Sequence, residues 1–409
     1  MPRILPVLAL TILVLMPSFV CADSPQFRGP DRDGIYPETD LLSTWPAKGP
    51  KLLWAAEGLG GSYSSVAVVG DRIYTTGDLE GQGHAFALDT AGTHVWRTAY
   101  GPVHSGNGYP GTRTTPTADG DSIYLLSSMG KAVAISAADG KIRWQVDLLA
   151  RFGGENLYFG ISESPLVDGD RVIYTPGGKD ATLVALDKKT GETIWATKGL
   201  SDTSAYCNPR IFDDGKHRQL ITLVQKNMVG IDPENGNLLW SQEYPARYDI
   251  HAVSPVFEGR KIFVSDGYGQ GSRLFELAAD GGSVKELWKE RKMDVHHGGA
   301  IFLDGHIYGA ADNGTWYVLD AASGEAKAKI PRLGKGAMIF ADDLLYGYTE
   351  KGEVVLVNPD PSKFEKISSF KITRGEGQHW SHPVIVEGVL YVRHGDVLMA
   401  YDVKAGSGT

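Results

Sequence analysis

The sequence has little of what marks nucleic-acid-binding, membrane-spanning or disulfide-bonded proteins. Basic residues number 40 against 49 acidic ones, and the net charge of −9 argues against nucleic acid or an anionic membrane surface as a partner. Apart from the N-terminal stretch, no apolar run approaches the roughly 18 residues of a membrane span. Of the two cysteines, Cys21 lies in that stretch, so Cys207 is expected to stand alone as a small buried residue without a disulfide.

The first 22 residues, MPRILPVLALTILVLMPSFVCA, have the pattern of a secretory signal peptide. Arg3 gives a positive start, an apolar stretch follows, and small residues precede the expected cleavage after Ala22. Cys21 would mark a lipoprotein instead, but Ser18-Phe19-Val20 lacks the Leu and the small residue usual before a lipidated cysteine. We therefore expect a protein secreted to the periplasm or cell envelope without a lipid anchor.

The chain repeats one short segment many times. Four copies place Gly four residues before Trp: HAFALDTAGTHVW (84–96), AVAISAADGKIRW (132–144), LVALDKKTGETIW (183–195) and MVGIDPENGNLLW (228–240). Looser copies lie at 274–288, 316–330, 354–370 and 398–406. Upstream of each copy, two alternating apolar segments meet at a tight turn, in most units rich in Asp, Glu or Gly, which predicts a β-hairpin.

Each unit thus predicts four short strands and three turns over about 38–50 residues. Eight such units without helical periodicity predict an all-β fold, an eight-bladed β-propeller of four-stranded antiparallel blades. The last unit ends soon after Asp402 without its final strand, so we expect an N-terminal strand near 51–56 to complete it and close the ring. The predicted parts are a signal peptide (1–22), an N-terminal extended segment (23–44) and the propeller (45–405).

The recurring residues of the repeat have structural roles in this interpretation. The Asp after the third strand, such as Asp89 or Asp187, can accept hydrogen bonds from backbone N–H groups of the following turn. The Gly, such as Gly191, supplies a positive φ. The Trp of the outer strand should pack between blades and bury apolar area worth roughly 2–3 kcal/mol. These tryptophans are Trp54, Trp96, Trp144, Trp195, Trp240 and Trp288.

The pattern A-L-D-x-x-T-G-x-x-x-W, complete at 185–195, resembles the repeat of the pyrroloquinoline-quinone-like (PQQ-like) propellers. The resemblance covers about residues 45–405 and implies an eight-bladed ring. Two branches of the family differ in function. Quinoprotein alcohol dehydrogenases hold PQQ and Ca²⁺ over the central channel, whereas BamB-like outer-membrane assembly propellers are non-catalytic scaffolds. FRGPDRDG (27–34) and TWP (44–46) also resemble secreted members of the family.

The long loops that lead from an outer Trp to the next inner strand mark the expected functional face. Those after Trp96 and Trp144 are aromatic and Gly-rich, and propellers usually place function on such loops. The first residues of the inner strands should ring the channel mouth, where convergent polar groups predict a binding site or, alternatively, bond one another and trapped water. They are Arg113, Glu163, Asn208, His251, His296, Lys335 and His379.

For a quinoprotein dehydrogenase, the resemblance implies that Glu163, Asn208 and Asp249 hold Ca²⁺, a cation that takes six or more oxygen ligands. Arg113 or Lys335 would then face the quinone. The sequence lacks the adjacent Cys pair typical of those enzymes and the C-x-x-C-H signature of their haem extensions. No cofactor is therefore expected, and PQQ with Ca²⁺ is the alternative.

Other motifs predict no site. His296 and His297 are adjacent in an expected strand, so their side chains should point to opposite faces and not share one metal. Asp31-Arg-Asp33-Gly34 resembles the start of a Ca²⁺ loop but lacks the later Glu, which favours a solvated turn. Gly267–Gly271 lacks the helix that a dinucleotide site requires.

The sequence thus favours a monomeric, non-catalytic binding or scaffold propeller of the cell envelope, one version being a role in outer-membrane protein assembly. An envelope protein, or a small or polymeric ligand, would meet the long-loop face. Two alternatives stay open. One is a dehydrogenase that oxidises alcohols or sugars. The other is a carbohydrate- or peptide-binding module, which is favoured if Tyr109, Tyr158, Phe159 and Trp380 cluster at the mouth.

Overall fold

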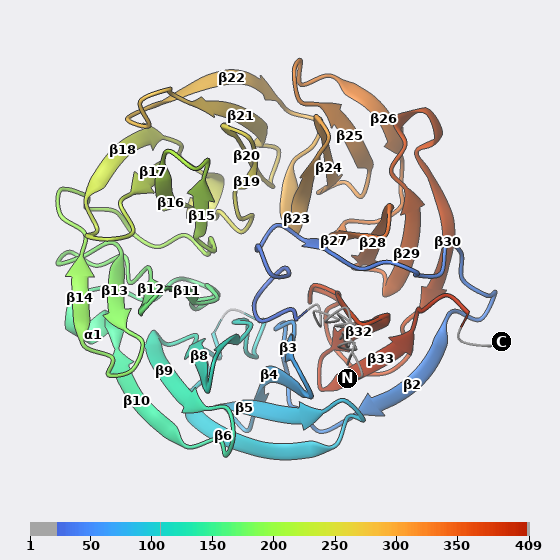
Figure 1. Ribbon diagram of the computed structural model, residues 1–409, viewed down its shortest axis with the longest axis horizontal. Helices are drawn as coiled ribbons and strands as arrows, with labels where there is room; N and C mark the ends of the chain where they lie inside the picture. Colours follow the sequence, from blue (N-terminus) through green and yellow to red (C-terminus); the bar gives the residue numbers. More distant parts are fainter. Residues whose placement is uncertain (1–22, 107, 407–409) are drawn as a thin grey trace, which may run out of the picture.

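Eight antiparallel blades of four strands each stand in a ring around a central axis (Figure 1). The computed structural model describes residues 23–406 except residue 107. Each blade runs from an inner strand beside the axis to an outer strand at the rim, and successive blades follow the chain around the ring. The eight-bladed propeller predicted from the repeat is confirmed.

Blades one to four occupy the first half of the ring. Blade one has β3 (Ala67–Val69), β4 (Arg72–Leu79), β5 (Gln82–Asp89) and β6 (His94–Pro102). Blade two has β7 (Thr117–Asp119), β8 (Ser122–Leu126), β9 (Lys131–Ser136) and β10 (Ile142–Asp147). Blade three has β11 (Leu166–Asp168), β12 (Arg171–Tyr174), β13 (Val184–Asp187) and β14 (Thr193–Ala196). Blade four has β15 (Arg210–Asp213), β16 (Arg218–Leu223), β17 (Asn227–Ile231) and β18 (Leu238–Glu243).

Blades five to eight complete the ring. Blade five has β19 (Val256–Glu258), β20 (Lys261–Asp266), β21 (Gly271–Leu277) and β22 (Val284–Glu290). Blade six has β23 (Val295–Leu303), β24 (His306–Ala311), β25 (Trp316–Asp320) and β26 (Ala326–Ile330). Blade seven has β27 (Gly336–Ala341), β28 (Leu344–Thr349), β29 (Glu353–Asn358) and β30 (Glu365–Lys371). Blade eight has β31 (Val384–Val386), β32 (Val389–His394), β33 (Val397–Asp402) and β2 (Lys51–Ala56).

The outer strand of blade eight comes from the other end of the chain, as the sequence predicts. Strand β2 pairs antiparallel with β33, with Lys51 opposite Asp402 and Ala56 opposite Leu398. This pairing joins the two ends of the propeller and removes two free strand edges. The connections between strands also hold the helix α1 (Leu148–Phe152) and the 3₁₀ turns η1 (Arg247–Asp249) and η2 (Pro361–Lys363).

The Asp, Gly and Trp of the repeat join neighbouring blades at five of the eight junctions of the ring. In blade three, the Asp187 carboxylate accepts a hydrogen bond from the Lys189 backbone N–H at 2.9 Å. Gly191 has φ +73°, and a Cβ at this position would lie 2.8 Å from the Trp144 ring of blade two. The Trp144 Nε1 donates to the Lys188 carbonyl at 3.0 Å. The Gly is therefore needed for close packing as well as for its φ.

The same contact recurs around the ring, including the closure between blades eight and one. The Trp rings that pack on a Gly of the next blade and donate to a carbonyl of its turn are Trp54 on Gly92, Trp96 on Gly140, Trp195 on Gly236 and Trp288 on Gly324. Trp240 differs, because its Nε1 donates at 2.7 Å to Gln219 Oε1 of its own blade.

The N-terminal segment, residues 23–36, crosses the middle of the ring, and we refer to it as the plug (Figure 1). Its last two residues form β1 (Ile35–Tyr36), which pairs in parallel with the inner strand β27. Hydrogen bonds join the plug to residues of blades one, two, three, four, six, seven and eight, which are Val68, Ala118, Pro165, Arg210, Ala300, Met338 and His382.

Two buried arginines hold the plug. Arg28 is 1% exposed, and its guanidinium donates to the carbonyls of Gly298, Ala300 and Met338 at 3.3, 2.7 and 3.1 Å. Arg32 is 2% exposed and donates at 2.7 Å to the carbonyl of Pro165. The predicted solvated turn at 31–34 is therefore wrong for Arg32. Outside the plug its partners are the backbone carbonyls of Ser164 and Pro165, and because every residue carries a carbonyl, no sequence pattern marks them.

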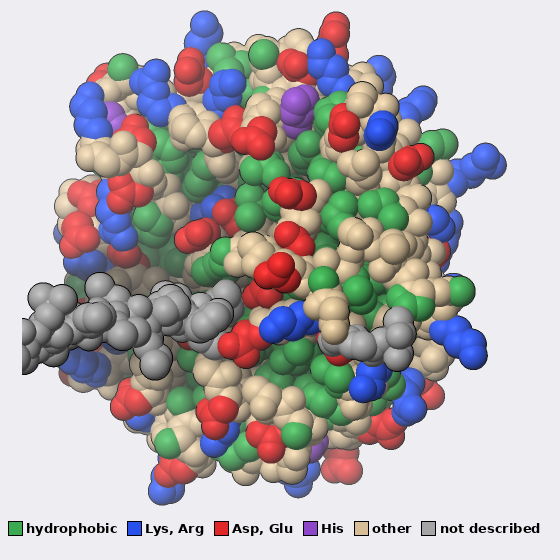
Figure 2. Space-filling view, turned by 45° about the vertical axis from the view of Figure 1, so that its right-hand side comes forward, with side chains coloured by type: hydrophobic (Ala, Val, Ile, Leu, Met, Phe, Trp, Pro, Cys, Tyr) green, Lys and Arg blue, Asp and Glu red, His purple; other side chains and the backbone are tan. Residues whose placement is uncertain are grey.

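Acidic and basic side chains are interspersed over the outside of the molecule (Figure 2). Outside the grey atoms, the face drawn there shows no broad basic area. This distribution agrees with the net charge of −9 and gives no electrostatic footprint for nucleic acid on that face. Within the described residues the longest helix, α1, has five residues, and none is suited in length and hydropathy to a membrane span.

Candidate functional site

The channel mouth on the long-loop face opens into a cavity of about 540 Å³. The volume lies within the roughly 300–1,000 Å³ that is typical of small-molecule sites. Phe27 of the plug lines it from within the channel. Each blade, or the loop that enters it, contributes at least one lining residue; in blade order these include Tyr63, Arg113, Ser162, Asn208, Ala252, His296, Lys335 and Trp380.

Four of the seven residues predicted to ring the mouth line this cavity: Arg113, Asn208, His296 and Lys335. Asn208 is only 5% exposed, and its Oδ1 accepts a hydrogen bond from the Ser164 backbone N–H at 2.6 Å. The cavity therefore gathers charged and polar groups from blades two, four, six and seven.

The other three predicted residues lie outside the cavity lining and have partners within the protein. His251 Nδ1 lies 2.9 Å from the Asp266 carboxylate, and neither side chain is exposed by more than 4%. His379 stacks on His394 with 3.8 Å between ring centroids. Glu163 is fully buried; its Oε1 accepts from the Thr175 backbone N–H at 3.2 Å, and burial raises its pKa to about 8.

Aromatic rings form a continuous wall on one side of the cavity. The Trp380 ring lies 5.1 Å from Tyr63 and 5.0 Å from Tyr109, measured between centroids. Tyr109 is 6.2 Å from Phe159, which in turn contacts Tyr158 at 4.8 Å. The four aromatic residues singled out from the sequence therefore cluster at the mouth, which is the arrangement stated above as favouring a carbohydrate or peptide site.

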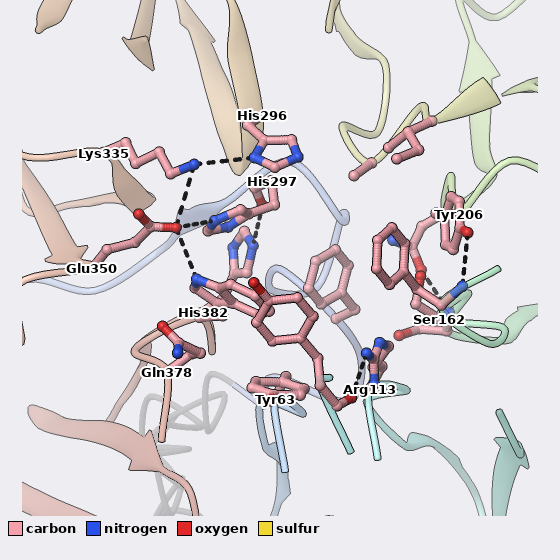
Figure 3. A pocket seen from close by; sticks show the side chains of 18 of the residues that line it. Tyr63, Arg113, Ser162, Tyr206, His296, His297, Lys335, Glu350, Gln378 and His382 are labelled. Atoms are coloured by element: carbon pink, nitrogen blue, oxygen red, sulfur yellow. Dashed lines mark hydrogen bonds and ion pairs between the residues drawn. The ribbon is translucent and has the colours of Figure 1, made fainter. Parts of the chain in front are cut away.

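A charged network adjoins the aromatic wall at Trp380 (Figure 3). Glu350 Oε1 accepts hydrogen bonds from His297 Nε2 at 2.9 Å and from Trp380 Nε1 at 2.8 Å. Lys335 Nζ lies 3.5 Å from the same oxygen and donates at 3.2 Å to His296 Nδ1. It also donates to Asp312 at 2.7 Å. The cation of Lys335 is therefore balanced within the protein by two carboxylates.

The network fixes the charge state of its members. Burial would raise the pKa of Glu350, but the hydrogen bond and charge of His297, together with Lys335 and Trp380, bring it down to about 2. Burial lowers the pKa of His296 to about 4, helped by the neighbouring charges of His297 and Lys335. At neutral pH, Glu350 is therefore ionised and His296 is a neutral imidazole whose Nδ1 accepts from Lys335.

His296 and His297 both line the cavity, so the expectation that they diverge is wrong (Figure 3). Their ring centroids lie 5.2 Å apart. The reason is a bulge in β23, where the pairing with β24 shifts register between Val295 and Ala300. Alternation of side chains holds only for regular strand, and a bulge re-aims the residues within it.

His382 connects the cavity to the plug. Its Nδ1 accepts a hydrogen bond from Arg28 at 3.3 Å, and its Nε2 donates to the His297 carbonyl at 3.0 Å. Burial and the charge of Arg28 hold the pKa of His382 well below its usual range. A neutral His382 thus bridges the plug and the bulged strand, and Phe27 of the plug forms part of the floor of the cavity together with His382.

The residues that the resemblance implies for Ca²⁺ do not fit that ion. Glu163 is fully buried, Asn208 Oδ1 is taken by Ser164, and Asp249 is exposed on η1. In the described part of the chain, no three His, Cys, Asp or Glu side chains are grouped to hold a metal ion. These residues therefore offer no set of free oxygens at one point, as Ca²⁺ requires.

Sequence reasoning missed the second source of lining residues. It considered only the starts of the inner strands, although in an antiparallel blade the turn between the second and third strands lies on the same face. Tyr268 follows β20, and Glu350 follows β28, and both line the cavity. The repeat pattern does locate these turns in the sequence. Their residues were not singled out because they resembled ordinary turn residues.

Comparisons with known proteins agree with the fold. A family model described as outer membrane protein assembly factor BamB matches residues 81–329. BamB of Burkholderia pseudomallei is 25% identical over 366 residues, covering 76% of this chain and 91% of that protein. Quinoprotein alcohol dehydrogenase PedH of Pseudomonas putida is 28% identical over 205 residues, covering 47% of this chain and only 30% of PedH.

Two solved structures show the same architecture. BamB from Moraxella catarrhalis has a TM-score of 0.63 at 14% identity, covering 88% of this chain and 99% of that one. Quinohemoprotein alcohol dehydrogenase from Comamonas testosteroni has a TM-score of 0.66 at 13% identity, covering 95% and 81%. At these identities the likeness shows the fold alone. The family match, which spans more than half of the chain, shows that this protein belongs to the PQQ-like repeat propellers of the family described as outer membrane protein assembly factor BamB.

Proposed function

We propose that this protein is a non-catalytic binding propeller of the periplasm or cell envelope, and that its ligand enters the mouth cavity. The observation that carries the proposal is the cavity itself, about 540 Å³ in volume, with an aromatic wall, a charged wall and a floor formed in part by the plug. Apolar walls with a few fixed polar groups are what small-ligand sites have in common.

The proposal also covers export, lipid anchoring, oligomeric state and cofactor content. The N-terminal 22 residues, which lie outside the described residues, would direct export, and Cys21 would not carry a lipid. The chain would act as a monomer without PQQ or Ca²⁺. The misfit of Glu163, Asn208 and Asp249 to Ca²⁺ supports the last point.

A second candidate is the docking of an envelope protein on the same face, in outer-membrane protein assembly. It is favoured by the alignment with BamB of Burkholderia pseudomallei, which spans 91% of that protein. The two candidates differ in where the partner sits. A small ligand needs the interior of the cavity, whereas a protein partner needs the loops around it.

A cavity-filling variant separates them. Ala252 lines the cavity, and Ala322 is exposed in the turn after Asp320, so Ala252→Trp and the control Ala322→Trp add the same side chain inside and outside. Labelled protein would be applied to arrays of neutral and acidic monosaccharides and of short peptides. We expect binding by the wild type and by Ala322→Trp, and loss of binding by Ala252→Trp.

Two results would count against the ligand site. Binding that survives in Ala252→Trp places the ligand elsewhere and favours docking on the loops. No binding to either array by the wild-type protein contradicts the proposal. Fractionation of producing cells supplies the second test: the proposal requires mature protein that begins at Asp23 in the envelope fraction.

A further inference from the structure

Arg113 is a cation of the cavity wall that has no carboxylate partner among residues 23–106 and 108–406. Its guanidinium lies 5.1 Å from the centre of the Tyr63 ring and donates to the carbonyls of Gly111 and Tyr109 at 3.1 and 2.8 Å. Burial lowers its pKa, and the groups that oppose this are the phenols of Tyr63 and Tyr206, not an acid. A guanidinium has five N–H donors, so several remain for a ligand.

The other charges of the cavity are balanced. Lys335 is paired with Asp312 and Glu350, and His296 and His382 are neutral because their pKa values lie below the usual range. Figure 3 places Arg113 on the opposite side of the cavity from Lys335 and Glu350. A half-buried cation without a counter-charge is costly, and a carboxylate on a ligand would satisfy it with charge-assisted hydrogen bonds.

We propose that the cavity binds a sugar acid, a pyranose ring that carries one carboxylate, with the carboxylate on Arg113 and one ring face against Trp380 and Tyr109. The proposal rests on the proposed function and names the ligand class of that same cavity. The aromatic corner of Tyr63, Tyr109 and Trp380 lies beside Arg113, because Arg113 stacks on Tyr63 and donates to Tyr109. The apolar faces of a pyranose match such rings.

The remaining polar groups suit hydroxyls. His296 has Nδ1 bonded to Lys335, and its other ring nitrogen lies on the far side of the ring in Figure 3. Among the described residues, that nitrogen, the Gln378 amide and the Tyr268 hydroxyl have no hydrogen-bond partner, and all three residues line the cavity. Neutral donors and acceptors spread around the wall match a ring with hydroxyls on several sides.

A peptide C-terminus is the competing source of a carboxylate. It would place its carboxylate and its amide groups at one end of the cavity, and the unpaired groups around His296 and Gln378 would have little to bind. The cavity is also walled by eight blades and partly floored by Phe27 and His382, so it suits a compact ring better than an extended chain.

Calorimetric titration of the full-length mature protein tests the proposal. The probes are the methyl glycosides of glucuronate and galacturonate, their neutral counterparts methyl glucoside and methyl galactoside, and a tripeptide with a free C-terminus. We expect at least one uronate to bind about tenfold or more tightly than its neutral counterpart, which is the scale of one hydrogen bond to a charged group. The affinity should fall as salt is raised.

A matched pair of variants assigns the effect to Arg113. Arg113→Gln removes the cavity charge, and Arg97→Gln removes a charge from the exposed outer strand β6. Arg113→Gln should reduce the uronate affinity about tenfold or more and remove the preference over the neutral sugar, whereas Arg97→Gln should change neither. If Arg113→Gln does not fold, the acid-to-neutral comparison in the wild type still decides the matter.

The other outcomes contradict different parts of the proposal. Equal affinity for the uronates and the neutral sugars overturns the role of Arg113. Binding of the tripeptide alone, lost in Ala252→Trp, overturns the sugar acid and leaves the proposed function standing. No binding of any probe, here or on the arrays, overturns both.

Discussion

Replacing Arg28 by Ala should destabilise the whole ring, although Arg28 lies in a segment that precedes the first blade. Its guanidinium donates to three buried carbonyls of blades six and seven, those of Gly298, Ala300 and Met338. A buried acceptor left without a donor costs about 1–3 kcal/mol, so three of them cost at least about 3 kcal/mol. Releasing the buried charge, whose pKa burial lowers to about 10, offsets part of this.

We therefore expect Arg28→Ala to lower the free energy of unfolding by about 2–4 kcal/mol. The assay is urea unfolding followed by tryptophan fluorescence and circular dichroism, with Arg97→Ala as a control that removes an exposed arginine. Arg28→Lys should recover only part of the loss, because an ammonium has three donors and no planar fork. A change for Arg28→Ala within about 0.5 kcal/mol of wild type would refute the reasoning, since that is the size of an ordinary surface substitution.

Three further predictions follow from the fold and the cavity. Gly191→Ala should destabilise the protein by at least about 1 kcal/mol more than Gly199→Ala in urea unfolding, because the added methyl group overpacks the contact. Both glycines have a similar positive φ, but only at Gly191 would a Cβ meet the Trp144 ring, and equal losses would contradict the packing role. The stability of the wild type should fall in two stages on acidification. The lowered pKa of His296 means that the folded protein binds this proton less tightly, so stability falls from about pH 6.5 down to about 4. The lowered pKa of Glu350 supplies stability that is complete above about 4.5 and is lost as pH falls through about 2. His379 and His382 also have a lowered pKa, so His296→Gln should make the upper stage shallower without removing it, and Glu350→Gln should do the same to the lower stage. Unchanged pH profiles of unfolding would contradict both assignments. Removal of metals with a chelator should leave the melting temperature unchanged, and a quinone absorbance that co-elutes with the protein after addition of PQQ and Ca²⁺ would show that the misfit at Glu163, Asn208 and Asp249 was wrongly interpreted.

The fold could be predicted from the sequence because its information is local and repeated. The Asp-Gly-Trp unit recurs with one period, and each copy encodes a turn whose geometry depends only on its own residues. The ring closure by β2 could also be predicted from the number of strands. Blade eight lacked an outer strand, and residues 48–54 had the pattern of an outer strand that belonged to no other blade. The contact that five of the Trp rings make with the Gly of the next blade did not follow, because it joins different copies of the unit.

The site could be predicted in part. Blade topology placed Arg113, Asn208, His296 and Lys335 at the mouth, and the structure brings these four to one cavity. The same reasoning did not place His297 at the cavity. A bulge in β23 changes the alternation of side chains, and no residue type in the sequence marks that bulge.

The plug could not be predicted at all. Arg28 and Arg32 bind backbone carbonyls of residues far along the chain, and such acceptors leave no trace in the sequence. Phe27 and His382 became part of the cavity floor only through those contacts. What the sequence showed was a motif, FRGPDRDG, without its place in the molecule.

The most direct test of the central claim is a calorimetric titration of the wild-type protein and Ala252→Trp with methyl glucuronide and methyl galacturonide. If the mouth cavity is the site of a sugar acid, the wild type binds at least one of them with one-site saturation and Ala252→Trp binds neither, while both proteins melt at the same temperature without ligand. Equal binding by the two proteins, or no heat of binding in the wild type, would contradict the account.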